Sequence, residues 1–349
     1  MENMNNKVRD SRFELLRLVA ILMVVLSHFS LFGQEQRLQL DPSLWDRIGA
    51  DLFTPFGKVG VGLFVLITGY FLGNKQSTII SAINRGWKIW AETIFYTAFM
   101  FVTFAIFSRE ISFGLLVKSI IPVTTVLYWF VTSYIVLILL SPILNLVLNQ
   151  MSQRQFQYLI TVTTVLNFMI PVLQINFELM VLLPYLLGSY LKQYGMEIKH
   201  KGVYLTLILL LSYILIIVLN TRGHGLALTI GIIPTITALL IFLIVLDFKP
   251  FHSSIINKFA TTSFAGYLIT EFPPMRNLLW NNVLALSNVD NALVADLIGF
   301  IAILLILYIG VFLIDLIRQK IFKALGVDNA PQHILAFLKN NKMLNRFYI

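Results

Sequence analysis

FELLRLVAILMVVLSHFSLF, residues 13–32, is an apolar run of about 20 residues, the length of helix that crosses a lipid bilayer. It nevertheless contains Arg17 and His28. Ionisable side chains at membrane depth cost about 3 kcal/mol or more each. The two are eleven positions apart in the sequence, so both lie on one face of a helix, about 16 Å apart along its axis. This shared face predicts a protein-lined cavity rather than contact with lipid.

The whole chain shares this apolar composition. Of its 349 residues, 58% are hydrophobic and 12% are charged, whereas soluble domains contain about 25% charged residues. We therefore predict an all-α fold, a polytopic membrane helix bundle of about ten transmembrane helices with both termini cytoplasmic. The predicted spans lie near residues 13–33, 58–74, 87–108, 127–148, 155–172, 177–194, 203–220, 226–246, 263–286 and 293–317.

Two segments depart from this regular pattern. Glu271, Pro273, Pro274 and Arg276 interrupt the ninth predicted span, and a broken helix with ionisable groups inside a bundle is typical of a cavity lining. The apolar piece 111–126 is better explained as a re-entrant or interfacial segment than as a full span.

The net charge of +9 could suggest nucleic-acid binding, but the distribution of the charges along the chain fits membrane topology better. With the N-terminus inside, most of the 26 lysines and arginines fall on the cytoplasmic side, as the positive-inside rule requires. We expect a transmembrane domain over residues 1–317 and a basic cytoplasmic tail over 318–349. The tail is partly amphipathic and is expected to lie on anionic membrane lipids, with partner binding as the alternative.

Some chemistry is excluded by composition. The chain has no cysteine, so it contains no disulfide, thiolate metal site or cysteine nucleophile. No two of its five histidines have the spacing of metal ligands, and we expect no metal site.

His28 is the leading candidate for a catalytic group. Imidazole titrates near neutral pH, which suits a general base, although a histidine at this depth can also be a helix-packing residue. Glu271 is positioned to orient or polarise His28 if the first and ninth spans meet. Arg17 lies close to the cytoplasmic end of its span, where it can extend to the interface or pair with Glu14, one turn earlier.

Arg85 and Lys88 lie one turn apart on the inner side, at the start of the third span. They are either ordinary positive-inside charges or a clamp for the phosphates of a donor substrate. Glu92 follows Lys88 at the spacing of an i,i+4 ion pair. The second span is rich in glycine, which favours close helix packing, with close approach of a ligand as the alternative.

These residues together resemble the acyltransferase-3 family of integral-membrane acyltransferases, in particular its stand-alone Gram-positive members. Phe13-Glu14 and the Arg17–His28 spacing are similar to its first-span motif, and Arg85-Gly-Trp-Lys88 is similar to its arginine-x-x-arginine motif with lysine in the last place. Thr270 stands where the family commonly has a histidine. Further similar stretches are GVGLFVLITGYFL (60–72), LYWFVTSYIVLILLSPILN (127–145), ATTSFAGYLITEFPPMRNLLW (260–280) and IDLIRQKI (314–321).

The resemblance implies an enzyme that transfers an acyl group other than an aminoacyl group. The expected reaction moves acetyl from cytoplasmic acetyl-CoA to a hydroxyl of a cell-surface or lipid-linked carbohydrate at the plasma membrane. Arg17, Arg85 and Lys88 would hold the acyl-CoA donor, and His28 would act as a general base or acyl relay. Arg17 could instead orient the catalytic site. With Thr270 in the histidine's place, either Glu271 assists or the reaction does without a second group; a changed substrate or a loss of the chemistry are the alternatives. The alternative function is a transporter or exporter of a polysaccharide or small solute, because such proteins also use broken helices.

Overall fold

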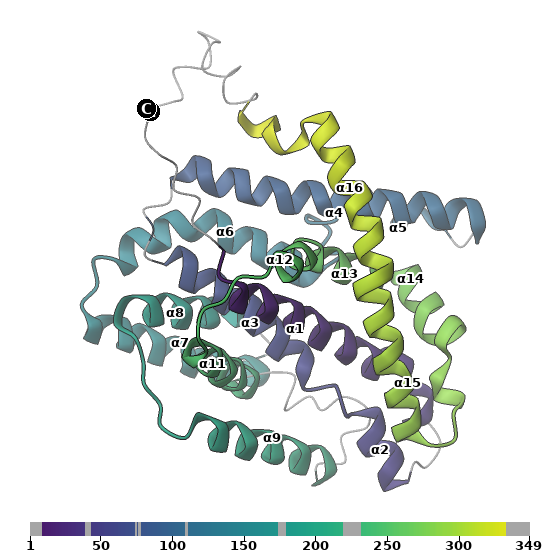
Figure 1. Cartoon of the computed structure of the whole chain (residues 1–349), viewed down its shortest axis with the longest axis horizontal. Helices are drawn as coiled ribbons and strands as arrows, with labels where there is room; N and C mark the ends of the chain where they lie inside the picture. Colours follow the sequence, from purple (N-terminus) through teal and green to yellow (C-terminus); the bar gives the residue numbers. More distant parts are fainter. Residues whose placement is uncertain are drawn as a thin grey trace. The chain divides into compact units, whose positions relative to one another are not determined.

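The fold is helical throughout the part of the chain that the computed structural model describes, namely residues 9–38, 43–73, 75, 78–108, 111–173, 179–218 and 232–332 (Figure 1). This confirms the predicted all-α class. The chain divides into two compact units. Unit 1 comprises Met1–Asn74 and Gln150–Phe312, and unit 2 comprises Lys75–Asn149 and Leu313–Ile349. A domain boundary at residue 317 stays a prediction.

The first predicted span forms helix α1, from Ser11 to His28, and continues as the π-helical turn η1, Phe29–Gly33. Asp10 caps α1, because its carboxylate accepts a hydrogen bond from the backbone N–H of Arg12, which has no partner inside the helix. Together Ser11–Gly33 is long and apolar enough to cross a membrane. The predicted length of the first span is therefore confirmed.

Unit 1 is built around α3, Phe56–Leu72. This helix packs against α1, α8 (Leu179–Tyr194) and α11 (Ile232–Asp247), as the crossing ribbons in Figure 1 indicate. Its side chains at Leu63, Leu66 and Ile67 are fully buried in this core.

Two glycines of α3 allow this close packing. A Cβ atom on Gly60 would lie 2.4 Å from the backbone oxygen of Ala20, and one on Gly69 would lie 2.2 Å from that of Tyr185. Real Cβ atoms do not approach backbone that closely, so α1 and α8 would have to move away. At these two positions the glycine-rich span serves helix packing.

The other helical elements of unit 1 lie at the ends and sides of this core. They are η2 (Glu35–Leu38), α2 (Leu44–Ala50), α7 (Gln153–Leu173), α9 (Lys201–Val218), α12 (Ser254–Ala260), α13 (Ser263–Thr270), α14 (Pro273–Asn277), η3 (Leu278–Leu284), η4 (Leu286–Asn288), α15 (Ala292–Leu305) and η5 (Ile306–Val311). The predicted ninth span is thus divided into α13, α14 and η3.

Unit 2 contains α4 (Ile79–Phe107), α5 (Phe113–Ile120), α6 (Trp129–Leu148), most of α16 (Phe312–Leu325) and the short turn η6 (Val327–Asn329). α4 packs against α5 and α6. The Trp87 indole N–H donates to the backbone oxygen of Val327 at 2.8 Å. With eight residues, α5 is too short to span a bilayer, as predicted for the segment 111–126.

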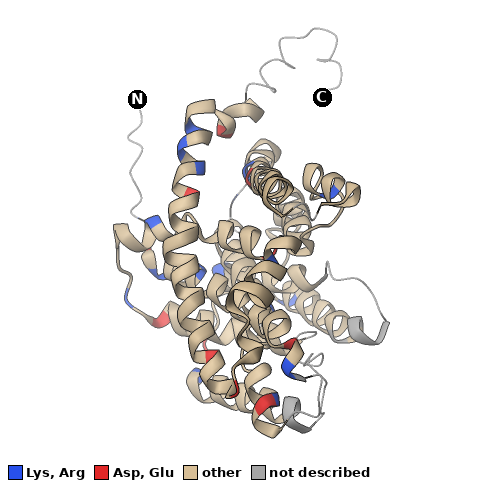
Figure 2. Cartoon of the chain, turned by 90° about the vertical axis from the view of Figure 1, so that its right-hand side faces the viewer, with Lys and Arg blue, Asp and Glu red and all other residues tan. Residues whose placement is uncertain are grey.

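Four helices of the described residues are long and apolar enough to cross a membrane: Ser11–Gly33, Ile79–Phe107, Trp129–Leu148 and Ala292–Leu325. Phe56–Leu72, Lys201–Ile214 and Ile232–Asp247 are shorter apolar helices. Most of the helical ribbon carries no charge (Figure 2). The count of about ten spans and the cytoplasmic termini stay predictions, and residues 333–349 of the predicted tail lie outside the described part.

Candidate active site

The structure brings together His28 and Glu271. Nδ1 of His28 lies 2.9 Å from Oε1 of Glu271, an ion-pair distance without the alignment of a hydrogen bond. Both side chains are largely buried, at 15% and 10% exposure. The contact is possible because α13 packs against α1. The first and ninth spans therefore meet, the condition that the sequence left open.

The position of Glu271 follows from the helix break. Proline lacks a backbone N–H and favours an extended conformation in the preceding residue. Accordingly α13 ends at Thr270, Phe272 is extended, and Pro273 begins α14. Glu271 is the C-terminal cap of α13, and its backbone N–H bonds to the oxygen of Tyr267. The two prolines thus place an acidic side chain at a helix end inside unit 1.

Arg276 is the third ionisable member of this cluster. Its Nη1 lies 3.5 Å from Oε2 of Glu271, and its guanidinium lies 4.1 Å from the ring centroid of Phe32. The Glu271 carboxylate therefore lies between the guanidinium of Arg276 and the imidazole of His28. The sequence indicated Arg276 only as a charge within a broken span and gave it no role.

Two neighbouring residues complete the cluster. The Tyr267 ring lies 6.0 Å from the His28 ring and is buried. Thr270, at the place where the family commonly has a histidine, is fully buried and donates its hydroxyl to the backbone oxygen of Gly266 at 2.8 Å. Its hydroxyl is thus bound within its own helix. Glu271, and not Thr270, reaches His28.

Arg17 lies away from this cluster. It forms an ion pair with Glu14 at 2.7 Å, as the sequence indicated, and its side chain is 31% exposed. Since α1 is continuous between Arg17 and His28, the two remain about 16 Å apart along the axis. The structure therefore does not bring Arg17 into contact with His28.

Arg85 and Lys88 lie on α4 of unit 2, which is described by itself. Arg85 is half-buried, and its Nη1 is a buried atom without a hydrogen-bond partner among the described residues, whereas Lys88 is exposed. The predicted ion pair between Lys88 and Glu92 is wrong. Glu92 instead approaches Arg318 of α16, with 3.5 Å between Oε1 and Nη2, because a buried carboxylate needs a buried cation.

The Glu92–Arg318 contact belongs to a network that the sequence did not indicate. Asp315 is fully buried and forms an ion pair with Arg318 at 2.6 Å. The Tyr96 hydroxyl donates to the same carboxylate at 2.7 Å. This network joins α4 and α16 within unit 2. The sequence shows Asp315 and Arg318 only as two charged residues at the end of an apolar run, with no sign of their partners on α4.

Within the described residues, no group of three or more histidine, aspartate or glutamate side chains could hold a metal ion.

Comparison with known proteins bears on the kind of chemistry. Residues 10–316 match the model of the acyltransferase-3 family, described as an acyltransferase domain. The match covers most of the chain, and the protein belongs to this family of membrane acyltransferases. No curated protein and no solved structure matches the chain.

Proposed function

We propose that this protein is a multi-pass O-acyltransferase of the plasma membrane that moves an acetyl group from cytoplasmic acetyl-CoA to a hydroxyl of a cell-surface or lipid-linked sugar. Family membership supports the acyl transfer. The observation that carries the site assignment is the 2.9 Å contact between His28 and Glu271.

His28 acts as the general base in this proposal. Because Nδ1 faces Glu271, Nε2 is the nitrogen left for the acceptor hydroxyl. Nε2 takes the hydroxyl proton as the acceptor oxygen attacks the thioester carbon. The tetrahedral intermediate collapses, the C–S bond breaks, and the departing CoA thiolate recovers the proton from the imidazolium. The product is an ester and free CoA, with no net change in protons on the enzyme.

Glu271 and Arg276 position the base. The Glu271 carboxylate stabilises the imidazolium that forms during the attack, as the acidic residue of a catalytic triad does. Arg276 holds the second carboxylate oxygen at 3.5 Å and limits the rotation of Glu271. Arg276 is a positioning residue, because it acts through Glu271.

The donor is assigned to the basic residues of the inner side. The buried Nη1 of Arg85 lacks a partner among the described residues and fits an anionic phosphate oxygen of CoA. Lys88 supplies a second positive charge but not the forked geometry of arginine. Arg17 is proposed as a third anchor along the pantetheine path, in competition with its partner Glu14.

Acetyl transfer from labelled acetyl-CoA tests the proposal. Membranes containing the wild type, His28→Ala, Arg85→Ala or the control His200→Asn are supplied with the label, and its appearance in glycan is followed. His200 is exposed and has a φ of 57°, a conformation that asparagine tolerates. We expect His28→Ala to lose activity by about 10²–10⁴-fold, Arg85→Ala to raise the KM for the donor, and the control to match the wild type.

The proposal fails if wild-type membranes transfer no label. It also fails if His28→Ala and His200→Asn transfer equally well. Movement of a sugar across the membrane without acetyl transfer would instead favour a transporter.

A further inference from the structure

A pocket of about 490 Å³ lies in unit 1 beside α2 and the start of α15. This volume is in the range of small-molecule sites. Its lining includes Ser43, Trp45, Asp46, Asp290, Asn291 and Leu293. None of these side chains contributes to the cluster around His28.

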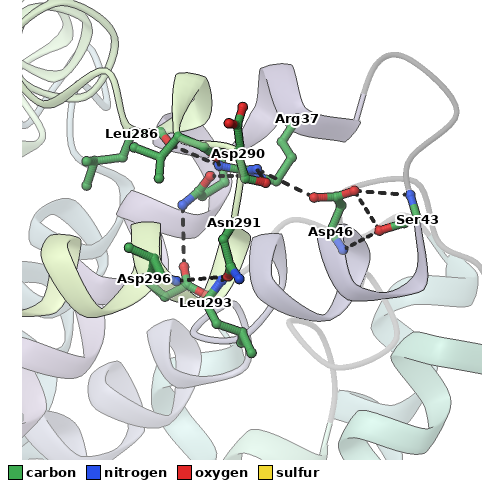
Figure 3. Close-up of polar contacts among 11 residues, drawn as sticks. Arg37, Ser43, Asp46, Leu286, Asp290, Asn291, Leu293 and Asp296 are labelled. Carbon is green, nitrogen blue, oxygen red and sulfur yellow. Dashed lines mark hydrogen bonds and ion pairs between the residues drawn. The ribbon is translucent and has the colours of Figure 1, made fainter.

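One wall of the pocket is rigid because Arg37 binds several groups at once (Figure 3). Its guanidinium is 6% exposed and lies 3.5 Å from the Asp46 carboxylate. It also donates to the backbone oxygens of Leu286 and Val289, at 2.9 and 2.6 Å. A single buried cation therefore ties α2 to the loop that precedes α15.

Asp46 is held in one orientation as a charged group. Its carboxylate accepts hydrogen bonds from the hydroxyl of Ser43 at 2.6 Å and from the backbone N–H of the same residue at 3.2 Å. The Ser43 hydrogen bond lowers the pKa of Asp46 below its usual value. The pocket thus presents a fixed carboxylate at neutral pH.

The opposite wall offers further polar groups. The side-chain oxygen of Asn291 accepts from the backbone N–H groups of Leu293 and Val294, so its amide N–H groups remain as donors. Asp290 is exposed, and its carboxylate makes no hydrogen bond or ion pair within the described part of the chain. The pocket therefore combines two carboxylate acceptors with an amide donor.

An apolar surface accompanies these groups. The Trp45 side chain is 65% exposed and Leu293 is 46% exposed, and both line the pocket. An indole ring offers a flat apolar face with few rotatable bonds. A pyranose ring has the matching chemistry, because its C–H face is apolar and its hydroxyl groups donate to carboxylates and accept from amides.

The charge of the pocket restricts which sugars fit. Asp46 and Asp290 are both acidic, and Arg37, the cation paired with Asp46, is only 6% exposed. An anionic sugar would be repelled, because like charges at a few ångströms are unfavourable. The pocket therefore suits a neutral sugar.

The position along the chain connects the pocket with the catalytic cluster. α1 ends at His28, and η1 and η2 follow it in the chain. η2 contains Arg37, which forms the ion pair with Asp46 of the pocket. The pocket thus lies beyond the His28 end of α1 and not beyond the Arg17 end. A glycan held there would approach His28 from the end of α1 that lies away from Arg17.

We propose that this pocket is a subsite for a neutral sugar unit of the acceptor glycan, with Trp45 beneath the ring and Asp290 and Asn291 bonded to its hydroxyl groups. Its role as an acceptor subsite rests on the function proposed above. Sugar binding in the pocket is a separate property and is measured without acyl transfer.

The test is binding of defined trisaccharides to the full chain in lipid nanodiscs, measured by calorimetry. The probes are maltotriose, cellotriose and chitotriose, which are neutral, and trigalacturonate, which is anionic. We expect at least one neutral trisaccharide to bind, Trp45→Ala to weaken it about tenfold, and Leu44→Ala to leave it within about twofold. Leu44 is the matched control, because it is an exposed neighbour on α2 outside the pocket lining.

A charge variant adds a second readout. Trigalacturonate is expected to bind at least about tenfold more weakly than the best neutral probe, and Asp290→Asn should narrow that difference by removing one negative charge. Absence of binding by all three neutral probes overturns the proposal. Equal loss in Trp45→Ala and Leu44→Ala also overturns it, since Trp45 would then be an interfacial anchor only.

The labelled-acetyl assay separates this proposal from the proposed function. Trp45-dependent sugar binding without acetyl transfer in the wild type would support the pocket and contradict the acyltransferase assignment. Acetyl transfer without Trp45-dependent binding would contradict the pocket alone.

Discussion

Glu271 is the residue on which the proposed chemistry of His28 depends most directly. Glu271→Gln keeps the size of the side chain but removes the charge that stabilises an imidazolium. We expect kcat to fall by about 10²-fold or more, with the KM for acetyl-CoA within about twofold of the wild type. Glu197→Gln, at an exposed position, is the control. An unchanged kcat, or equal losses in both variants, would contradict a role for Glu271 in positioning His28.

Residue identities predicted part of this site. Ionisable groups are costly in an apolar run, so His28 and Glu271 were evident from the sequence, but their contact depends on the packing of α13 against α1. The position of Arg276 beside Glu271 depends on the turn that Pro273 introduces. The partner of Glu92 was missed because Arg318 lies far away in sequence, whereas Lys88 has a favourable local spacing.

At the scale of helices, the packing of α3 against α8 depends on Gly69. Gly69→Ala places a methyl group 2.2 Å from the backbone oxygen of Tyr185, and backbone cannot yield as a flexible side chain would. We expect the free energy of unfolding to fall by about 1–3 kcal/mol, measured by thermal unfolding in detergent. Gly202→Ala, which has open space around it, should be neutral or slightly stabilising. Equal stability of the two variants would contradict close packing at Gly69.

The buried network of unit 2 makes a second prediction about helix packing. Arg318→Met removes the cation and leaves Glu92 and Asp315 buried without it. We expect a loss of about 3–5 kcal/mol in the free energy of unfolding, because an uncompensated buried charge is unfavourable. Lys320→Met on the same helix is exposed and should cost little. Similar stabilities for the two variants would show that the network does not hold α4 and α16 together.

Hydropathy located the apolar runs but not where the helices end. α4 begins at Ile79, before the predicted 87, and the helix that includes α16 extends to Leu325, beyond the predicted 317. In both cases the extension contains charged residues, Arg85 in one and Arg318, Lys320 and Lys323 in the other. A hydropathy window stops at such residues, whereas backbone hydrogen bonds and buried ion pairs allow the helix to continue.

At the scale of the whole molecule, the orientation in the membrane can be measured directly because the chain has no cysteine. Single cysteines replace the exposed residues Glu35 and Lys199, and a membrane-impermeant maleimide is added to intact cells. The charge distribution predicts labelling of Glu35→Cys without permeabilisation and of Lys199→Cys only after it. The reverse pattern would invert the topology and place the sugar pocket on the donor side.

The central claim, that His28 is the base for acyl transfer, is tested most directly by chemical rescue. Single-turnover transfer of labelled acetyl from acetyl-CoA to glycan is measured in membranes containing His28→Ala, with and without added imidazole. We predict that the variant loses about 10²–10⁴-fold in rate and that imidazole restores part of it, because a free base occupies the space of the missing side chain. Transfer by His28→Ala at the wild-type rate would contradict the claim.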